Sequence, residues 1–212
     1  MRTFNIYLID FDGTLINSYD GLYLFYNDVF NPFGAVVSKE EAYYFSKISL
    51  EAAFDIKIKD PSKYIDFKKK CYEVIDTKVL LKYNKPFPDA LKLIEFLKRN
   101  KLISGVVTGN AEKQVQLVFN NLGLDNFYDV LISGDRINKQ KPDPEGIFKA
   151  LTALKYQGEL KDVAYIGDSY NDFLAASKAG VTPILIDRFN EFPPSDKYIR
   201  ITTLEKLIND RF

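Results

Sequence analysis

The sequence contains no histidine, and this absence excludes several kinds of chemistry. Without an imidazole the chain cannot build a Ser-His-Asp triad, a histidine general base or a His-ligated zinc site. It also has a single cysteine, Cys71, which cannot form an internal disulfide and has no histidine to activate it as a nucleophile. Any catalysis must therefore use carboxylates, lysines, hydroxyls and backbone groups.

A net charge and a long apolar segment are absent as well. Lysine plus arginine and aspartate plus glutamate number 29 each, so no overall field attracts nucleic acid or an anionic membrane. The opening apolar run is broken at Asp10, too early for a membrane span, and it has no signal-peptide layout. Together with the one cysteine, these features predict a cytoplasmic protein with no nucleic-acid or membrane partner.

Glycine and proline are scarce, at 11 and 9 residues, and we expect a chain that is ordered nearly throughout. Its 212 residues, 46% of them hydrophobic, can bury a substantial core. This length suits one domain, or one domain with a sizeable insertion.

Short apolar runs that end in polar residues or glycine are what the sequence does contain. They have the length and the two-sided hydrophobicity of buried parallel strands, and they cover residues 4–10, 102–109, 129–133, 162–168 and 182–187. Between the later runs, apolar residues recur at helical spacing, over 89–100, 112–123, 144–156 and 171–180. Strands alternating with helices predict an α/β fold, a Rossmann-like parallel sheet flanked by helices.

The alternation fails between the first run and the second. Residues 16–83 carry an almost wholly helical pattern, although a crossover between parallel strands needs only one helix. The prolines of "NKPFP" (84–88) stop helix propagation and mark the return. We therefore predict a catalytic core formed by residues 1–15 and 86–212, and an inserted helical domain over residues 16–85.

Four polar motifs lie at the carboxyl ends of the predicted strands, where open parallel sheets bind their ligands. The motifs are "DFDGT" (10–14), "VTGN" (107–110), "KPDP" (141–144) and "GDSYND" (167–172). If the sheet forms, the chemistry-bearing side chains of these motifs converge on one crevice: Asp10, Asp12, Thr108, Lys141, Asp168 and Asp172.

Such a crevice has the groups that phosphoryl transfer requires. Several carboxylates without nitrogen or sulfur ligands favour a hard cation, and Mg²⁺ suits a few carboxylates together with a substrate phosphate. A threonine hydroxyl, a lysine and backbone N–H groups beside glycine can bind phosphate oxygens. Asp10 would attack phosphorus, and Asp12 would protonate the leaving oxygen and later deprotonate the attacking water.

The four motifs, in this order, resemble those of the haloacid dehalogenase superfamily of aspartate-nucleophile hydrolases. The resemblance implies that Asp10 is the nucleophile and a metal ligand, and that Asp12 is the acid/base with its backbone carbonyl on the metal. It implies further that Asp168 binds the metal and that Asp172 binds it directly or through water. Phosphate or substrate would be bound by Thr108, Gly109, Asn110 and Lys141. Asn110 has a second interpretation, as the cap of the helix that starts at Ala111.

With an aspartate at position 12, the chain resembles the phosphatases and phosphomutases of the superfamily. The dehalogenases and transport ATPases of the superfamily lack this aspartate. The insertion resembles the helical cap of the phosphoglycolate phosphatase and beta-phosphoglucomutase subgroup. Within it, "FSKISLEAAF" (45–54) is similar to the segment that sets specificity, but Lys47 stands where that subgroup usually has glycine. Lys47 could contact an anionic substrate group, or it could be a solvated surface lysine.

The sequence thus predicts a cytoplasmic Mg²⁺-dependent phosphatase of small phosphorylated metabolites, acting as a monomer or homodimer. Two alternatives stay open. A phosphomutase of the beta-phosphoglucomutase type would need a second phosphate site in the cap, where the subgroup's arginine is replaced by Leu50 and the whole insertion lacks arginine. A phosphometabolite-binding regulator would keep the fold without turnover.

Overall fold

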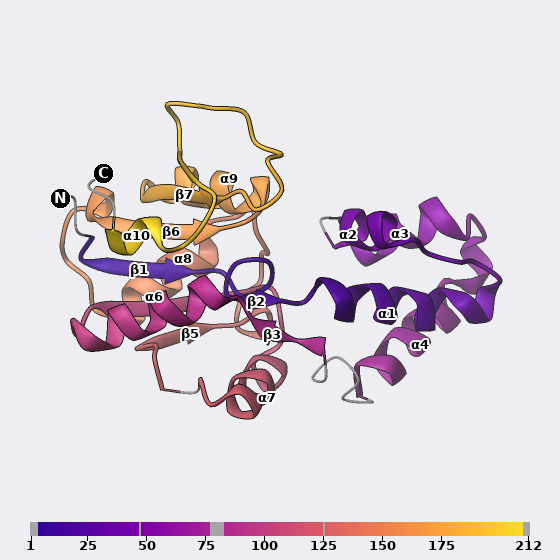
Figure 1. The fold of residues 1–212 in the computed structure, drawn as a ribbon. Coiled ribbons are helices and arrows are strands. Elements are labelled where there is room, and N and C mark those ends of the chain that lie inside the picture. Colours follow the sequence, from indigo (N-terminus) through magenta and orange to yellow (C-terminus); the bar gives the residue numbers. More distant parts are fainter. Residues whose placement is uncertain (1–3, 47, 77–82, 125, 210–212) are drawn as a thin grey trace. The chain divides into compact units, whose positions relative to one another are not determined.

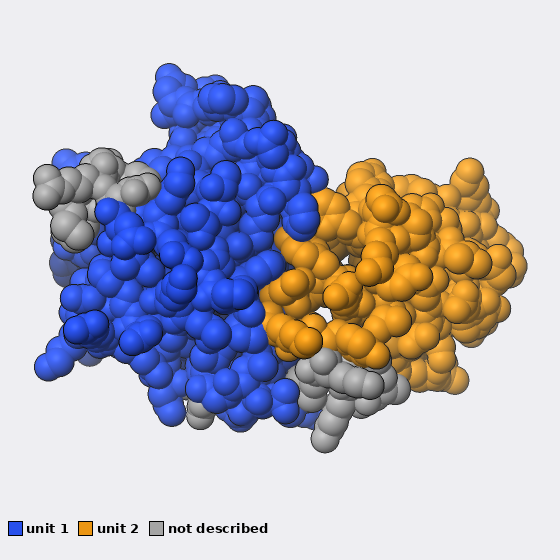
Figure 2. Space-filling view, in the orientation of Figure 1, with its two compact units in different colours: residues 1–16, 86–212 blue, residues 17–85 orange. Residues whose placement is uncertain are grey.

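The computed structural model describes residues 4–46, 48–76, 83–124 and 126–209. The chain divides into two compact units, one formed by residues 1–16 and 86–212 and the other by residues 17–85 (Figure 2). Two short strands, β2 (Ile16–Asn17) and β3 (Lys85–Pro86), pair where the chain passes from the first unit to the second and back. Among the described residues, no helix combines the length and the hydrophobicity that a membrane span requires.

The first unit is built on a six-stranded parallel sheet with the strand order β5-β4-β1-β6-β7-β8. The strands are β1 (Ile6–Ile9), β4 (Ile103–Val107), β5 (Val130–Ile132), β6 (Val163–Gly167), β7 (Thr182–Ile186) and β8 (Ile199–Ile201). β1 lies in the centre, where Ile6 pairs with Ile103 of β4 and with Val163 of β6. All residues of β1 and β6 are buried, as expected for strands covered on both faces.

Helices connect most of these strands (Figure 1). They are α6 (Pro88–Arg99), α7 (Glu112–Leu122), α8 (Glu145–Ala153) and α9 (Tyr170–Ala179), and a short helix, α10 (Lys206–Asn209), follows β8. Small residues on α8 and α9, such as Ala150 and Ala176, let these helices pack closely on Tyr165 and the aliphatic side chains of the sheet. The predicted Rossmann-like α/β core is therefore confirmed.

β8 is a strand that the sequence pattern did not predict. It has only three residues, and its middle residue is Arg200, so its apolar run is too short to stand out. In the structure, Arg200 Nε donates to the buried carboxylate of Asp187 at 2.7 Å, which satisfies both charges at the edge of the sheet. The partly buried Arg200 thus has a charged partner at the end of the neighbouring strand β7.

The second unit consists of helices with a core of their own. They are α1 (Tyr19–Phe30), α2 (Lys39–Phe45), α3 (Leu50–Lys57), α4 (Tyr64–Asp76) and two short 3-10 helices (Asn31–Phe33 and Pro61–Lys63). Ser38 caps α2 in a capping box with Glu41. The core is rich in aromatic rings, and Phe67 lies with its ring centroid 5.0 Å from that of Phe30 and 4.9 Å from that of Phe54.

Candidate active site

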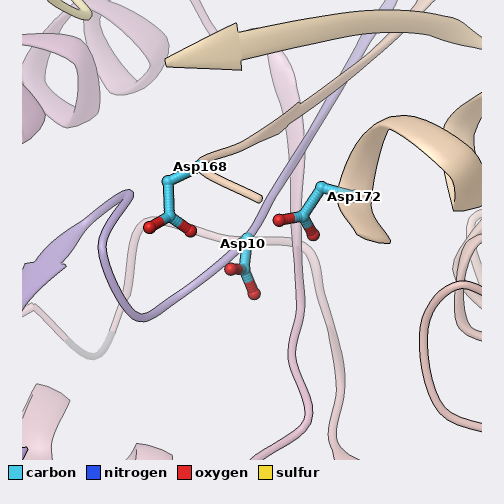
Figure 3. A group of neighbouring side chains, drawn as sticks. All are labelled: Asp10, Asp168 and Asp172. Atoms are coloured by element: carbon cyan, nitrogen blue, oxygen red, sulfur yellow. The ribbon is translucent and has the colours of Figure 1, made fainter. Parts of the chain in front are cut away.

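Three carboxylates gather at the carboxyl ends of the two central strands (Figure 3). Asp10 directly follows β1, Asp168 directly follows β6, and Asp172 lies in the first turn of α9. Each offers an oxygen atom within 4.8 Å of the others. The backbone N–H of Asp10 donates to Ile166 O at 2.8 Å, so the pairing of β1 with β6 continues to the site.

Lys141 lies between two of these acids. Its Nζ is 2.7 Å from Oδ1 of Asp10 and 2.6 Å from Oδ1 of Asp172, and its side chain is largely buried. Burial opposes the charge of the lysine, but Asp10 and Asp172 outweigh burial and hold its pKa well above the usual range. Lys141 is therefore a fixed positive charge inside an acidic site.

Asp10 is buried as well, and burial disfavours the charged form of its carboxyl group. Burial raises the pKa of Asp10 well above its usual range; Lys141 opposes this shift, while Asp172 and Asp168 add to it. A second cation beside Asp10 would favour its ionised form. The site thus has one lysine for several acids, which is consistent with a place for a metal ion.

The carboxylate of Asp172 is saturated with hydrogen bonds. Its Oδ1 accepts from Lys141 Nζ and, at 3.2 Å, from the hydroxyl of Tyr165, while its Oδ2 accepts from both the backbone N–H and the hydroxyl of Ser169. A carboxylate has about four lone-pair sites, so these contacts use all of them. In this arrangement Asp172 completes the capping box of Ser169 at the start of α9 and orients Lys141, and with Asp10 and Asp168 it forms a group of acids that could hold a hard cation such as Mg²⁺.

Tyr165 is a contact that sequence reasoning missed. It lies in β6, fully buried, and its hydroxyl reaches Asp172 and, at 3.4 Å, the carbonyl oxygen of Val107. One signal was available: a tyrosine in an otherwise aliphatic buried strand needs a polar partner for its hydroxyl. The partner could not be identified without the fold.

Asp12 and the loop after β4 form the second part of the site. Asp12 is half-buried, and the side-chain amide of Asn110 donates to its Oδ2 at 2.5 Å. The backbone N–H of Asn110 donates to the hydroxyl of Thr108 at 3.2 Å, and Thr108 is buried. The interpretation of Asn110 as a helix cap is wrong here, because Ala111 is the N-cap of α7 and Asp135 accepts from the backbone N–H of Glu112.

The structure brings together Asp10, Lys141, Asp168 and Asp172, and it joins Asp12 to the 108–110 loop through Asn110. Gly109 lies in that loop beside Gly134. Lys47 lies outside the described residues.

Gly134 is a further site residue without a sequence prediction. A Cβ atom there would lie 2.0 Å from Gly109 O, and the backbone N–H of Gly134 donates to Asn110 O at 2.7 Å. Only glycine permits this approach of the loops after β4 and β5. Their close contact fixes the backbone on either side of Gly109.

Replacing Gly134 by alanine should therefore displace the 108–110 loop, since the clash is with backbone and not with a flexible side chain. We expect a loss of about 1–3 kcal/mol in the free energy of unfolding and a clear loss of the phosphate affinity that the sequence predicts for this loop. Urea denaturation and equilibrium dialysis with inorganic phosphate would measure the two effects. Wild-type values for both would contradict the assigned packing.

Comparison with known proteins places this geometry in a family. The chain matches the family described as haloacid dehalogenase-like hydrolase over residues 7–186. It is 28% identical to a phosphoglycolate phosphatase of Aquifex aeolicus over 189 residues, which are 85% of this chain and 83% of that protein. It is 27% identical to the pyrophosphatase PpaX of Bacillus mycoides, over 86% of this chain and 83% of that protein.

A solved structure supports the same assignment. A Bacteroides fragilis protein described as a haloacid dehalogenase-like hydrolase has a TM-score of 0.83 and 26% sequence identity, and the match covers 97% of this chain and all of that one. The resemblance that the four motifs indicated is therefore confirmed, and the prediction of a phosphoric monoester hydrolase agrees with relatives that are named phosphatases. The chain belongs to the haloacid dehalogenase-like hydrolases.

Proposed function

We propose that this protein is a Mg²⁺-dependent phosphatase that hydrolyses a small phosphorylated metabolite through an aspartyl phosphate on Asp10. The observation that carries the proposal is the contact of Lys141 Nζ with Asp10 Oδ1 at 2.7 Å, next to Asp168 and Asp172. A carboxylate repels a phosphate dianion unless cations lie beside both, and this site has one built-in cation at the attacking oxygen.

The side chains of the site divide the work in two steps. In the first, an oxygen of Asp10 bonds to phosphorus, the bond to the leaving oxygen breaks, and Asp12 donates its proton to that oxygen. In the second, Asp12 takes a proton from water and the water oxygen bonds to phosphorus, while the bond between phosphorus and the Asp10 oxygen breaks. This step regenerates the Asp10 carboxylate and releases inorganic phosphate. Asn110, which donates to Asp12 Oδ2, holds this carboxyl group in one orientation in both steps.

Mg²⁺ is proposed as the metal, because the acids that could hold it, Asp10, Asp168 and Asp172, offer only oxygen ligands, to which the proposal adds the backbone carbonyl of Asp12. When bound, the ion neutralises charge on the phosphate and on Asp10. Asp172 also holds the ammonium group of Lys141 at 2.6 Å, and Thr108, Gly109 and the Lys141 charge bind the phosphate oxygens.

The helical unit of residues 17–85 is proposed to act as a cap that excludes water and selects the substrate. Similarity to relatives named phosphoglycolate phosphatase and pyrophosphatase supports a small anionic substrate for this chain. We include Lys47 in this proposal as a contact for the anionic part of the leaving group.

The decisive measurement is phosphate release from a panel of phosphoglycolate, sugar phosphates, nucleotides and pyrophosphate, with Mg²⁺ and after its removal by EDTA. We expect hydrolysis of at least one small phosphate ester, its loss by a factor of about 10³ or more on chelation, and its recovery when Mg²⁺ is added back. Phosphate transfer between sugar hydroxyls without release would indicate the mutase. Binding without turnover under any metal would contradict the enzyme.

A further inference from the structure

Arg188 is a nearly buried cation that the proposed chemistry leaves unused. It follows β7, and 13% of its side chain is exposed. Its Nε donates to the carbonyl oxygen of Gly13 at 3.1 Å, and its Nη2 donates to that of Thr14 at 2.9 Å. These are the two residues that directly follow Asp12.

The same guanidinium group is held from its other side by Asp89, in the first turn of α6. Arg188 Nη1 donates to Oδ2 of Asp89 at 2.9 Å and Nη2 donates to Oδ1 at 3.1 Å, a two-pronged pairing that fixes the plane of the group. Oδ2 of Asp89 also accepts from the hydroxyl of Thr203 and the backbone N–H of Leu204. Asp89 is thus a fixed anchor, and Arg188 has little freedom to move.

The ring of Phe87 fixes the guanidinium further, with its centroid 3.6 Å from the central carbon of Arg188. The backbone N–H of Phe87 donates to Leu15 O at 3.0 Å, so this residue also contacts the loop after β1. Arg188 therefore connects the end of β7, the loop that carries Asp12 and the start of α6.

The loop after β1 depends on backbone contacts for its shape. Gly13 has a positive φ of 71°, its N–H donates to Ile16 O at 2.9 Å, and the carbonyl oxygen of Phe11 accepts from Leu15 and Ile16. The hydroxyl of Thr14 is buried and has no hydrogen-bond partner in the described part of the chain, so it does not anchor the loop. The Arg188 guanidinium supplies the donors for two carbonyl groups of this turn.

We propose that Arg188 is a positioning residue that keeps the carboxyl group of Asp12 aligned with the leaving oxygen. This inference rests on the phosphatase function proposed above. Asn110 restrains the carboxylate of Asp12 directly, whereas Arg188 restrains the backbone from which it projects. Loss of either restraint lets the acid drift, and a displacement of about 1 Å at a catalytic group can cost about 100-fold in rate.

The leaving group provides a test that a purely structural role would not affect. A nitrophenolate departs without a proton, whereas an alkoxide needs the acid. The variants Arg188→Met and Arg188→Lys would be compared with wild type on para-nitrophenyl phosphate and on the alkyl phosphate of the panel that the wild type hydrolyses fastest. For Arg188→Met, we expect kcat/KM to fall about tenfold or more for the alkyl ester and less than about threefold for the aryl ester.

Arg188→Lys keeps the positive charge but cannot make both the two-pronged pairing with Asp89 and the two carbonyl contacts. We therefore expect its loss of kcat/KM to lie between those of wild type and Arg188→Met, and to be larger for the alkyl ester than for the aryl ester. Arg200→Met is the matched control. Arg200 also pairs with a buried acid after β7, namely Asp187, but its hydrogen bonds go to Asp187 and Asn190 in the described chain. We expect this control to lower the melting temperature without changing the ratio of alkyl to aryl rates.

A double-mutant cycle separates the route through Asp12 from a general loosening of the site. If Arg188 acts through Asp12, Arg188→Met should leave the ratio of alkyl to aryl kcat/KM unchanged in an Asp12→Asn background. Two results would overturn the role of Arg188 while leaving the phosphatase function intact. One is an equal loss of kcat/KM for the two esters in Arg188→Met, and the other is a change in the alkyl-to-aryl ratio that is as large in the Asp12→Asn background as in the wild type. A wild type that releases phosphate from neither ester would overturn both.

Discussion

Replacing Asp10 by asparagine should abolish turnover while the protein stays folded. Asparagine has the size of aspartate but cannot attack phosphorus, and removing a covalent nucleophile lowers rates by about 10⁴-fold or more. The protein should stay folded, because Lys141 keeps Asp172 as its partner and the neutral amide removes the cost of burying a charge at position 10. The measurements are phosphate release, thermal melting and detection of acid-stable or hydroxylamine-sensitive phosphate on the protein.

The control for this prediction is Asp187→Asn. Asp187 is another buried acid directly after a strand of the sheet, β7, and it accepts hydrogen bonds from Arg200 and from two backbone N–H groups. Its replacement should destabilise the protein and preserve the rate per folded molecule, the reverse of the Asp10 pattern. Full activity of Asp10→Asn, or a phosphoprotein that survives in this variant, would show that Asp10 is not the nucleophile.

Replacing Lys141 by methionine should damage stability as well as activity. The methionine keeps the apolar stem but leaves Asp10 and Asp172 without their shared cation, and removal of one partner of a buried ion pair costs about 3–5 kcal/mol. For a chain of this size, we expect a fall of about 10 °C or more in the melting temperature without metal. Phosphate release should fall by about 10³-fold, because the phosphate loses its fixed positive partner.

Mg²⁺ sharpens this test. With Lys141 gone, a bound metal ion is the remaining cation for the acids, so saturating Mg²⁺ should raise the melting temperature of the variant more than that of the wild type. Lys139→Met is the control, since the Lys139 side chain is 73% exposed and lies 3.9 Å from Asp143. A Lys141 variant with wild-type melting behaviour would show that the acids do not depend on this lysine.

Local pattern was enough to predict the sheet and the place of the site. Buried parallel strands are apolar on both faces and end in polar residues, so the runs that end at Asp10 and Asp168 indicated both the strands and the edge where the acids meet. Lys141 could be placed in the same crevice because its motif follows the predicted strand over 129–133. The chemical roles of these residues remain predictions.

Contacts across the fold were not predictable. Arg188 after β7 looks like an ordinary loop arginine until Gly13, Thr14 and Asp89 are brought around it. Gly134 has no distinctive neighbours in sequence, and its need for glycine comes from the backbone of Gly109. Each of these contacts joins residues that are far apart in the sequence, and a single sequence does not show which distant residues meet in the fold.

The aromatic core of residues 17–85 has a consequence for how such a hydrolase acquires new substrates. Phe30, Phe54 and Phe67 belong to a hydrophobic core made only of residues of this unit, separate from the core of the sheet that positions Asp10 and Asp168. Surface positions of the insert can therefore diversify during evolution without eroding the catalytic apparatus. If the insert selects the substrate as proposed, selection can recruit one reaction mechanism for many metabolites by changing a unit with a core of its own.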